Sequence, residues 1–110
     1  MTIVDAVPAR HERPMIDEAA LAAARDADLL LSAALARGSV RWEEFLSPLP
    51  GQLRDVGLRD LRKVAMRARA AYGPKDSIRE ALPPELTEPF LIDLDRLLKA
   101  IARETMEGRL

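Results

Sequence analysis

The chain has 110 residues, 48% hydrophobic and 32% charged, which is enough for one folded domain with a single core. Its formal net charge is −1, so no global electrostatic attraction to nucleic acid or to an anionic membrane is expected. The absence of cysteine excludes disulfides, thiolate metal sites and thiol nucleophiles, and it is compatible with a reducing cytoplasm.

Residues that catalysis usually needs are scarce as well. The five glycines stand singly, so the chain has no glycine-rich loop that could cradle a phosphate or a dinucleotide. His11 is the only histidine, and it lies outside every segment with a helical pattern. The sequence therefore predicts a protein that is not an enzyme and that uses no cofactor, metal ion or small-molecule substrate.

The N-terminal residues 1–15 show neither the period of a strand nor that of a helix. We predict a flexible arm there, followed by a single helical domain over residues 16–110. The first residues do not combine a cationic leader with an apolar block, as a secretory signal would. The most apolar segment, residues 19–36, is interrupted by charged residues, which argues against a membrane span. We therefore expect a cytoplasmic protein.

A first long helix is predicted over about residues 16–37, with Gly38 as its stop. One face of this helix collects Ala20, Ala23, Ala24, Ala27, Leu31, Ala34 and Leu35. A second, narrower strip contains Ala22, Leu29, Ala33 and Ala36. Two interpretations are open: the helix is central and covered on two sides, or its second strip is the interface of a homodimer.

A short helix is predicted over residues 40–46, in which Trp42 shares a face with Phe45 and Leu46. At this spacing, Trp42 is expected to close the end of a helical bundle. Residues 47–51 contain two prolines and a glycine and are predicted to break the chain.

The clearest helical pattern lies at about residues 57–72. Its apolar stripe consists of Leu58, Leu61, Ala65, Ala68 and Tyr72. Its opposite side carries Arg59, Lys63 and Arg67 at i, i+4 and i+8. Gly73 suits the left-handed position that follows the last turn of a helix.

The chain ends with a short helix and a long one. The short helix is predicted over about residues 77–82, with Asp76 or Ser77 as its cap. The long helix is predicted over about residues 88–107, with Pro89 in its first turn.

No segment alternates with the period of a strand. The predicted fold class is therefore all-α. We expect a small helical bundle of three long helices and two short ones.

The leading functional hypothesis is a protein that acts by protein–protein interaction, as a homodimer or as a subunit of a larger assembly. Leu29, Leu30 and Leu31 are consecutive, so steps of 100° prevent all three from facing one neighbour. The first helix thus has more apolar surface than one contact covers. The interface candidates are Ala22, Leu29, Ala33 and Ala36.

The alternative hypothesis is a nucleic-acid-binding regulator that uses the basic face of the central helix. The candidates for contact with phosphates, or with an acidic partner, are Arg59, Lys63, Arg67 and Lys75. The helix at residues 40–46, a proline-glycine turn and the central helix would then form a relative of the helix-turn-helix. Residues 58–82 are also similar in outline to helix–extended–helix nucleic-acid modules of the SAP and Rho N-terminal types. The similarity lies in a leucine-patterned helix and in a lysine that precedes a second, short helix.

Overall fold

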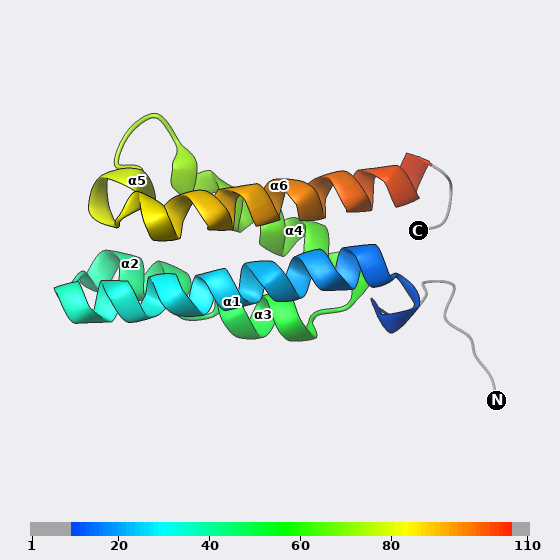
Figure 1. Cartoon of the computed structure of the whole chain (residues 1–110), viewed down its shortest axis with the longest axis horizontal. Coiled ribbons are helices and arrows are strands. Elements are labelled where there is room, and N and C mark those ends of the chain that lie inside the picture. The colour runs from blue at the N-terminus through cyan, green and yellow to red at the C-terminus, as the bar shows by residue number, and fades with distance from the viewer. Residues whose placement is uncertain (1–9, 107–110) are drawn as a thin grey trace.

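The computed structural model describes residues 10–106, and within this range every regular element is a helix (Figure 1). The three long helices are α1 (Pro14–Arg37), α4 (Leu58–Arg69) and α6 (Pro84–Met106). The short helices are α2 (Val40–Leu46), α3 (Leu49–Asp55) and α5 (Ile78–Ala81), and the 3-10 turns are η1 (Arg10–Glu12) and η2 (Ala70–Tyr72). The predicted fold class, a small all-α bundle, is confirmed.

The central helix of the bundle is α1, which packs on α6 and also on α3 and α2 (Figure 1). The residues that it turns inward are mostly alanines with no exposed surface: Ala20, Ala23, Ala24, Ala27 and Ala34. Such small side chains let neighbouring helices approach closely. Of the two interpretations of this helix, the first, a central helix, describes how α1 packs against the other helices of the chain.

The large core side chains come mainly from the helices around α1. Those with less than 2% of their surface exposed include Leu30, Leu49, Leu53, Leu61, Phe90, Leu94 and Leu97. The inward stripe predicted for α4 is confirmed at Leu58, Leu61, Ala65 and Ala68, all of which are buried. Trp42 is 6% exposed and belongs to the same core.

The end of α1 has the predicted geometry. Gly38 has a φ of 68°, in the left-handed region where a side chain is disfavoured. Its N–H donates to the carbonyl of Leu35 at 3.1 Å, and the N–H of Ser39 donates to that of Ala34 at 3.0 Å. These two bonds satisfy carbonyls that the last turn leaves unpaired.

The predicted chain break at residues 47–51 is shorter than expected: a turn at Ser47 and Pro48 separates α2 from α3, which begins at Leu49. Pro50 lies at the start of this helix, where the missing N–H of proline has no helical partner to lose. Leu49 and Leu53 are buried, so packing of this short helix stabilises a segment whose composition suggests a turn.

A proline at the start of a helix also explains why α6 begins earlier than predicted. Pro84 is its first residue, four positions before the predicted start at residue 88. Pro89 is therefore inside the helix instead of in its first turn. Pro89 and Glu85 are both exposed, so water can bond the carbonyl of Glu85 that the proline leaves unpaired.

The connection between η2 and α5 corrects one prediction and confirms another. Gly73 has a φ of −67° and is not left-handed, whereas Asp76 has a φ of 52°. Ser77 caps α5, because its Oγ accepts a hydrogen bond from the N–H of Arg79 at 3.1 Å.

The predicted N-terminal arm falls largely outside the described residues, which begin at Arg10. Arg10 donates to Asp17 at 2.9 Å and to the carbonyl of Val56 at 3.1 Å. Arg13 forms an ion pair with Glu104 at 3.1 Å. The helix starts at Pro14, two residues before the predicted position, and these contacts fix its first turn to α6 and to the residue after α3.

Candidate functional site

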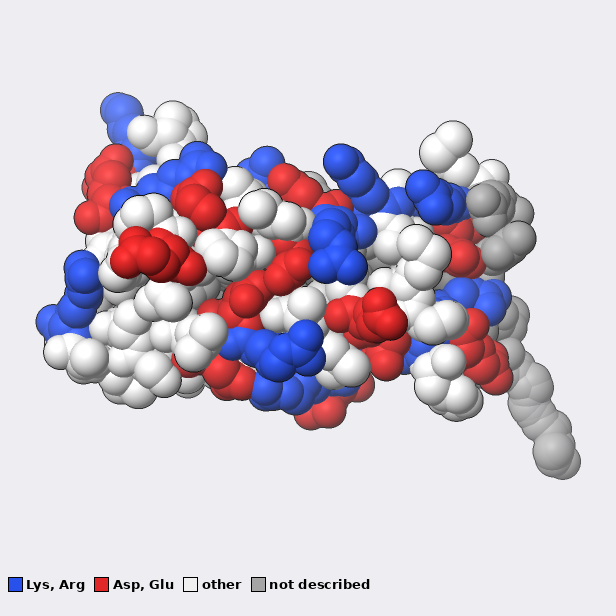
Figure 2. Space-filling view, viewed as in Figure 1, with Lys and Arg blue, Asp and Glu red and all other residues white. Residues whose placement is uncertain are grey.

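The C-terminal half of α1 exposes large apolar side chains. Leu29 is 56% exposed and Leu35 is 53% exposed. Residues 29–36 contain no charged side chain, and Figure 2 shows an uncharged surface over this part of α1, at the lower left. The α1 outer face is defined here by Leu29, Ser32, Ala33, Leu35 and Ala36. It is the main uncovered apolar surface of the central helix.

The position of Leu35 differs from the prediction, which placed it on the buried face with Ala34. The inward direction of α1 is centred near Ala27 and Ala34, and a step of 100° beyond Ala34 brings Leu35 to the surface. Leu30 takes the inward position instead and has no exposed surface.

The four predicted interface residues do not form one uniform strip. Leu29 and Ala36 are exposed, whereas Ala22 and Ala33 are half-buried. Ala33 also packs against the core and forms the edge of the α1 outer face. Ala22 lies almost two turns before Leu29, on the same side of α1 but about 10 Å away along the helix, and charged Arg25 and Asp28 lie between them.

A second candidate surface is the basic stripe of α4, defined by Arg59, Lys63 and Arg67. All three side chains are exposed on the side of α4 opposite the core. Arg67 donates to Oε1 of Gln52 on α3 at 3.5 Å. Asp60 is also exposed on this helix and reduces the local positive charge.

The structure does not support the helix-turn-helix arrangement considered for this stripe. The whole of α3 stands between α2 and α4, in place of a turn. Lys75 is not on α4 but in the connection that follows η2, where it lines a pocket.

This pocket, which we call the Trp42 pocket, has a volume of about 450 Å³. It is lined by Arg41, Trp42, Glu44, Phe45, Ala70, Ala71, Lys75 and Asp76. Arg41 lies 4.7 Å from the centre of the Trp42 ring, and the rings of Trp42 and Phe45 meet edge to face at 5.5 Å. Two basic and two acidic residues line the pocket, so its charges balance and favour no class of ligand.

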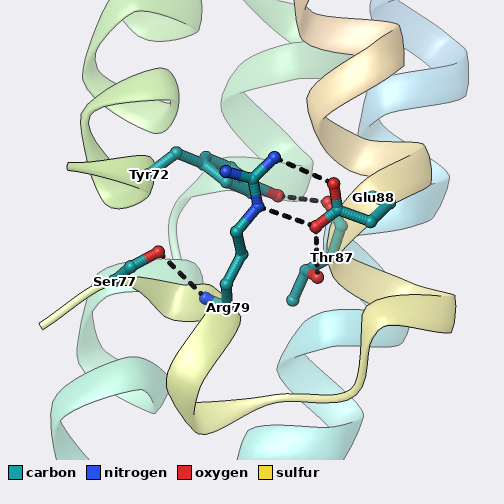
Figure 3. Close-up of polar contacts among 5 residues, drawn as sticks. All are labelled: Tyr72, Ser77, Arg79, Thr87 and Glu88. Atoms are coloured by element: carbon teal, nitrogen blue, oxygen red, sulfur yellow. Dashed lines mark hydrogen bonds and ion pairs between the residues drawn. The ribbon is translucent and has the colours of Figure 1, made fainter. Parts of the chain in front are cut away.

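A network of polar contacts connects η2 and α5 to the first turns of α6 (Figure 3). Arg79 donates twice to Glu88, at 2.9 Å each, and lies 5.4 Å from the centre of the Tyr72 ring. The hydroxyl of Tyr72 donates to the carbonyl of Thr87, and the hydroxyl of Thr87 donates to Glu88. The partners of Tyr72 and Arg79 are consecutive residues of α6, so the network ties η2 and α5 to that helix. Its role is structural, because every group in it has a partner within the chain.

A pair of carboxyl groups lies at the contact between α1 and α6. Burial, together with a hydrogen bond and charge repulsion from Asp93, raises the pKa of Asp26 to about 7. Oδ2 of Asp26 is shielded from solvent and lacks a donor. A protonated Asp26 can donate its O–H to the carboxylate of Asp93, which also accepts a hydrogen bond from Arg96 at 2.9 Å. Sequence reasoning missed this pair because its two members are distant in the chain.

Neither a metal site nor a membrane span is found in the described part of the chain. Within residues 10–106, no three histidine, cysteine or acidic side chains are grouped so that they could hold a metal ion. None of the helices in this range is both long and apolar enough to cross a bilayer. Comparison with models of protein families, with curated proteins and with solved structures gives no match for this chain.

Proposed function

We propose that the protein acts by protein–protein interaction through the α1 outer face, as a homodimer or as a subunit of an assembly, and not by catalysis. The observation that carries this proposal is the exposure of Leu29 (56%) and Leu35 (53%) on an uncharged run of the central helix. A single exposed leucine is ordinary on a protein surface. A continuous apolar area that is bordered by charged residues is typical of a contact site.

Packing within the chain gives no reason for these leucines. The core on the other side of α1 is complete, because its alanines and Leu30 have no exposed surface. The charged residues nearest to the face, Asp28 and Arg37, each have a partner on another element of the chain. They can therefore stay at the border of an interface without being buried unpaired.

The test is sedimentation velocity across the micromolar range, with a pull-down from the source of the protein. We expect the wild type to associate, and we expect Leu29→Glu to weaken association at least about tenfold, because a carboxylate would be buried in an apolar contact. Met66→Glu is the matched control, because Met66 is 46% exposed but lies on α4. A wild-type protein that stays monomeric and recovers no partner would contradict the proposal.

A further inference from the structure

The α1 outer face has a pattern that is symmetric about one residue. Leu29, Ser32 and Leu35 follow one another at intervals of three, so they form a single ridge on the surface of the helix. The two outer members are both leucines with nearly equal exposure, 56% and 53%. The central member is small, so the ridge is low at its middle and high on either side.

Such a ridge fits a copy of itself. In a two-fold symmetric dimer the same patch lies on both subunits. Where the axis is perpendicular to α1, the two helices run antiparallel. With the axis at Ser32, Leu29 of one copy packs on the partner's Leu35, and Leu35 packs on the partner's Leu29. The two small serines meet at the crossing point, where they let the helix backbones approach.

The charges around the face are compatible with this arrangement. Asp28 is four residues before Ser32, so it faces the partner's Ala36, four residues after it. Arg25 is seven residues before Ser32, so it lies beyond the end of the partner's α1, which stops at Arg37. No two like charges are opposed, and Asp28 keeps its ion pair with Arg54 of α3.

We propose that the α1 outer face binds a second copy of this chain, with the two α1 helices antiparallel and a two-fold axis at Ser32. This inference rests on the proposed function and names the partner of the same surface. A single pair of crossing helices is smaller than the roughly 1,600 Å² that standard interfaces bury, so we expect dissociation in the micromolar range.

The test uses the absence of cysteine from the chain. In Ser32→Cys, the new thiol lies on the axis and meets its own copy, within the short distance that a disulfide requires. Ser47→Cys is the matched control, because Ser47 is also exposed but lies between α2 and α3. Under mild oxidation of the full chain, we expect Ser32→Cys to form covalent dimers at least about tenfold faster, because the dimer holds its thiols at high effective concentration. We expect Leu29→Glu, added to it, to remove that advantage.

The outcomes separate this inference from the proposed function. Equal rates of cross-linking for the two cysteine variants would overturn the axis at Ser32. If Leu29→Glu still weakened association of the wild-type chain in that case, the face would be functional with another geometry or partner. A wild type that neither self-associates nor binds a partner would overturn both proposals together.

Discussion

The two helices α1 and α4 each turn one face to the core and one to solvent, but they distribute their side chains in opposite ways. On α4 the large apolar residue Leu61 is buried, and the exposed stripe is basic. On α1 the buried residues are mainly alanines, and Leu29 and Leu35 are exposed. The outer side of α4 carries charged side chains, as expected of a surface that faces water, whereas the outer side of α1 exposes two leucines.

The energies involved show why this difference matters. Burying a leucine side chain completely contributes about 1.5–3 kcal/mol relative to leaving it in water. Leu29 and Leu35 each keep about half of their surface exposed in the monomer. Their complete burial by a partner would therefore contribute roughly 2 kcal/mol per chain, whereas the basic stripe of α4 offers no comparable apolar gain.

The largest effect is expected on the buried side of α1, where close packing of the helices depends on small side chains. Ala27→Leu adds three heavy atoms at a position with no exposed surface, between α1 and the helices that cover it. We expect a loss of about 2–3 kcal/mol in the free energy of unfolding, because overpacking forces the helices apart. Urea denaturation measures it.

The matched control is the same substitution on the exposed side. Ala36→Leu is expected to change the free energy of unfolding by less than about 0.5 kcal/mol, because Ala36 is exposed in the monomer. The measurement is made at a concentration where the chain is monomeric. Equal destabilisation by both variants would show that α1 has no distinct inner and outer sides.

A smaller effect, dependent on pH, is expected at Asp26, where α1 contacts α6. Its pKa is raised to about 7, mainly by burial, whereas an unfolded aspartate has a pKa of about 3.9. Between these values the folded state keeps a proton that the unfolded state has lost. The stability that this proton contributes is fully present below about pH 4 and is lost as the pH rises through about 7.

Asp26→Asn should remove this loss. The full shift would correspond to about 4 kcal/mol, but Asp26 is partly exposed, so we expect the variant to gain only about 1–2 kcal/mol near pH 8. Near pH 4.5 the gain should be small. Urea denaturation at several pH values measures the difference, with the exposed Asp60→Asn on α4 as control. A variant that follows the wild-type pH dependence would show that Asp26 does not hold this proton.

The helices themselves were predictable from hydrophobic period and end signals, and the errors lie at prolines. Pro50 and Pro84 suggest breaks in the sequence, but each occupies the first turn of a helix, where proline is tolerated. Only packing distinguishes the two cases: Leu49 and Leu53 have a core to enter, and a sequence pattern does not show what lies opposite. Gly73 was predicted to be left-handed, but Asp76 is the left-handed residue of this connection. The path of the connection, and not the presence of a glycine, determines which residue takes that conformation.

The candidate site was predictable only in part. Three consecutive leucines at residues 29–31 cannot all face one neighbour, and the helical period assigned Leu29 to the second strip. The period does not say whether that strip is covered, because this depends on where α3 and α6 lie. The structure selects Leu29 and adds Leu35, which the sequence assigned to the core. The Asp26–Asp93 pair and the Trp42 pocket bring together residues from distant segments, and no local pattern predicts such contacts.

The smallest effect is expected on the outer side of α4. Arg59→Glu, Lys63→Glu and Arg67→Glu, combined in one chain, replace exposed side chains and should leave self-association unchanged. Each exposed charge contributes little, so we expect a change in stability of less than about 1 kcal/mol, measured by urea denaturation.

The same variant tests the nucleic-acid alternative by titration of labelled DNA and RNA at several salt concentrations. If the three side chains contact phosphates, the logarithm of the wild-type binding constant should fall with the logarithm of the salt concentration with a slope of about −3. The variant should lose this binding. That result would make the basic stripe of α4 a functional surface and end the contrast with α1, whereas equal binding by both proteins would leave it a solvated face.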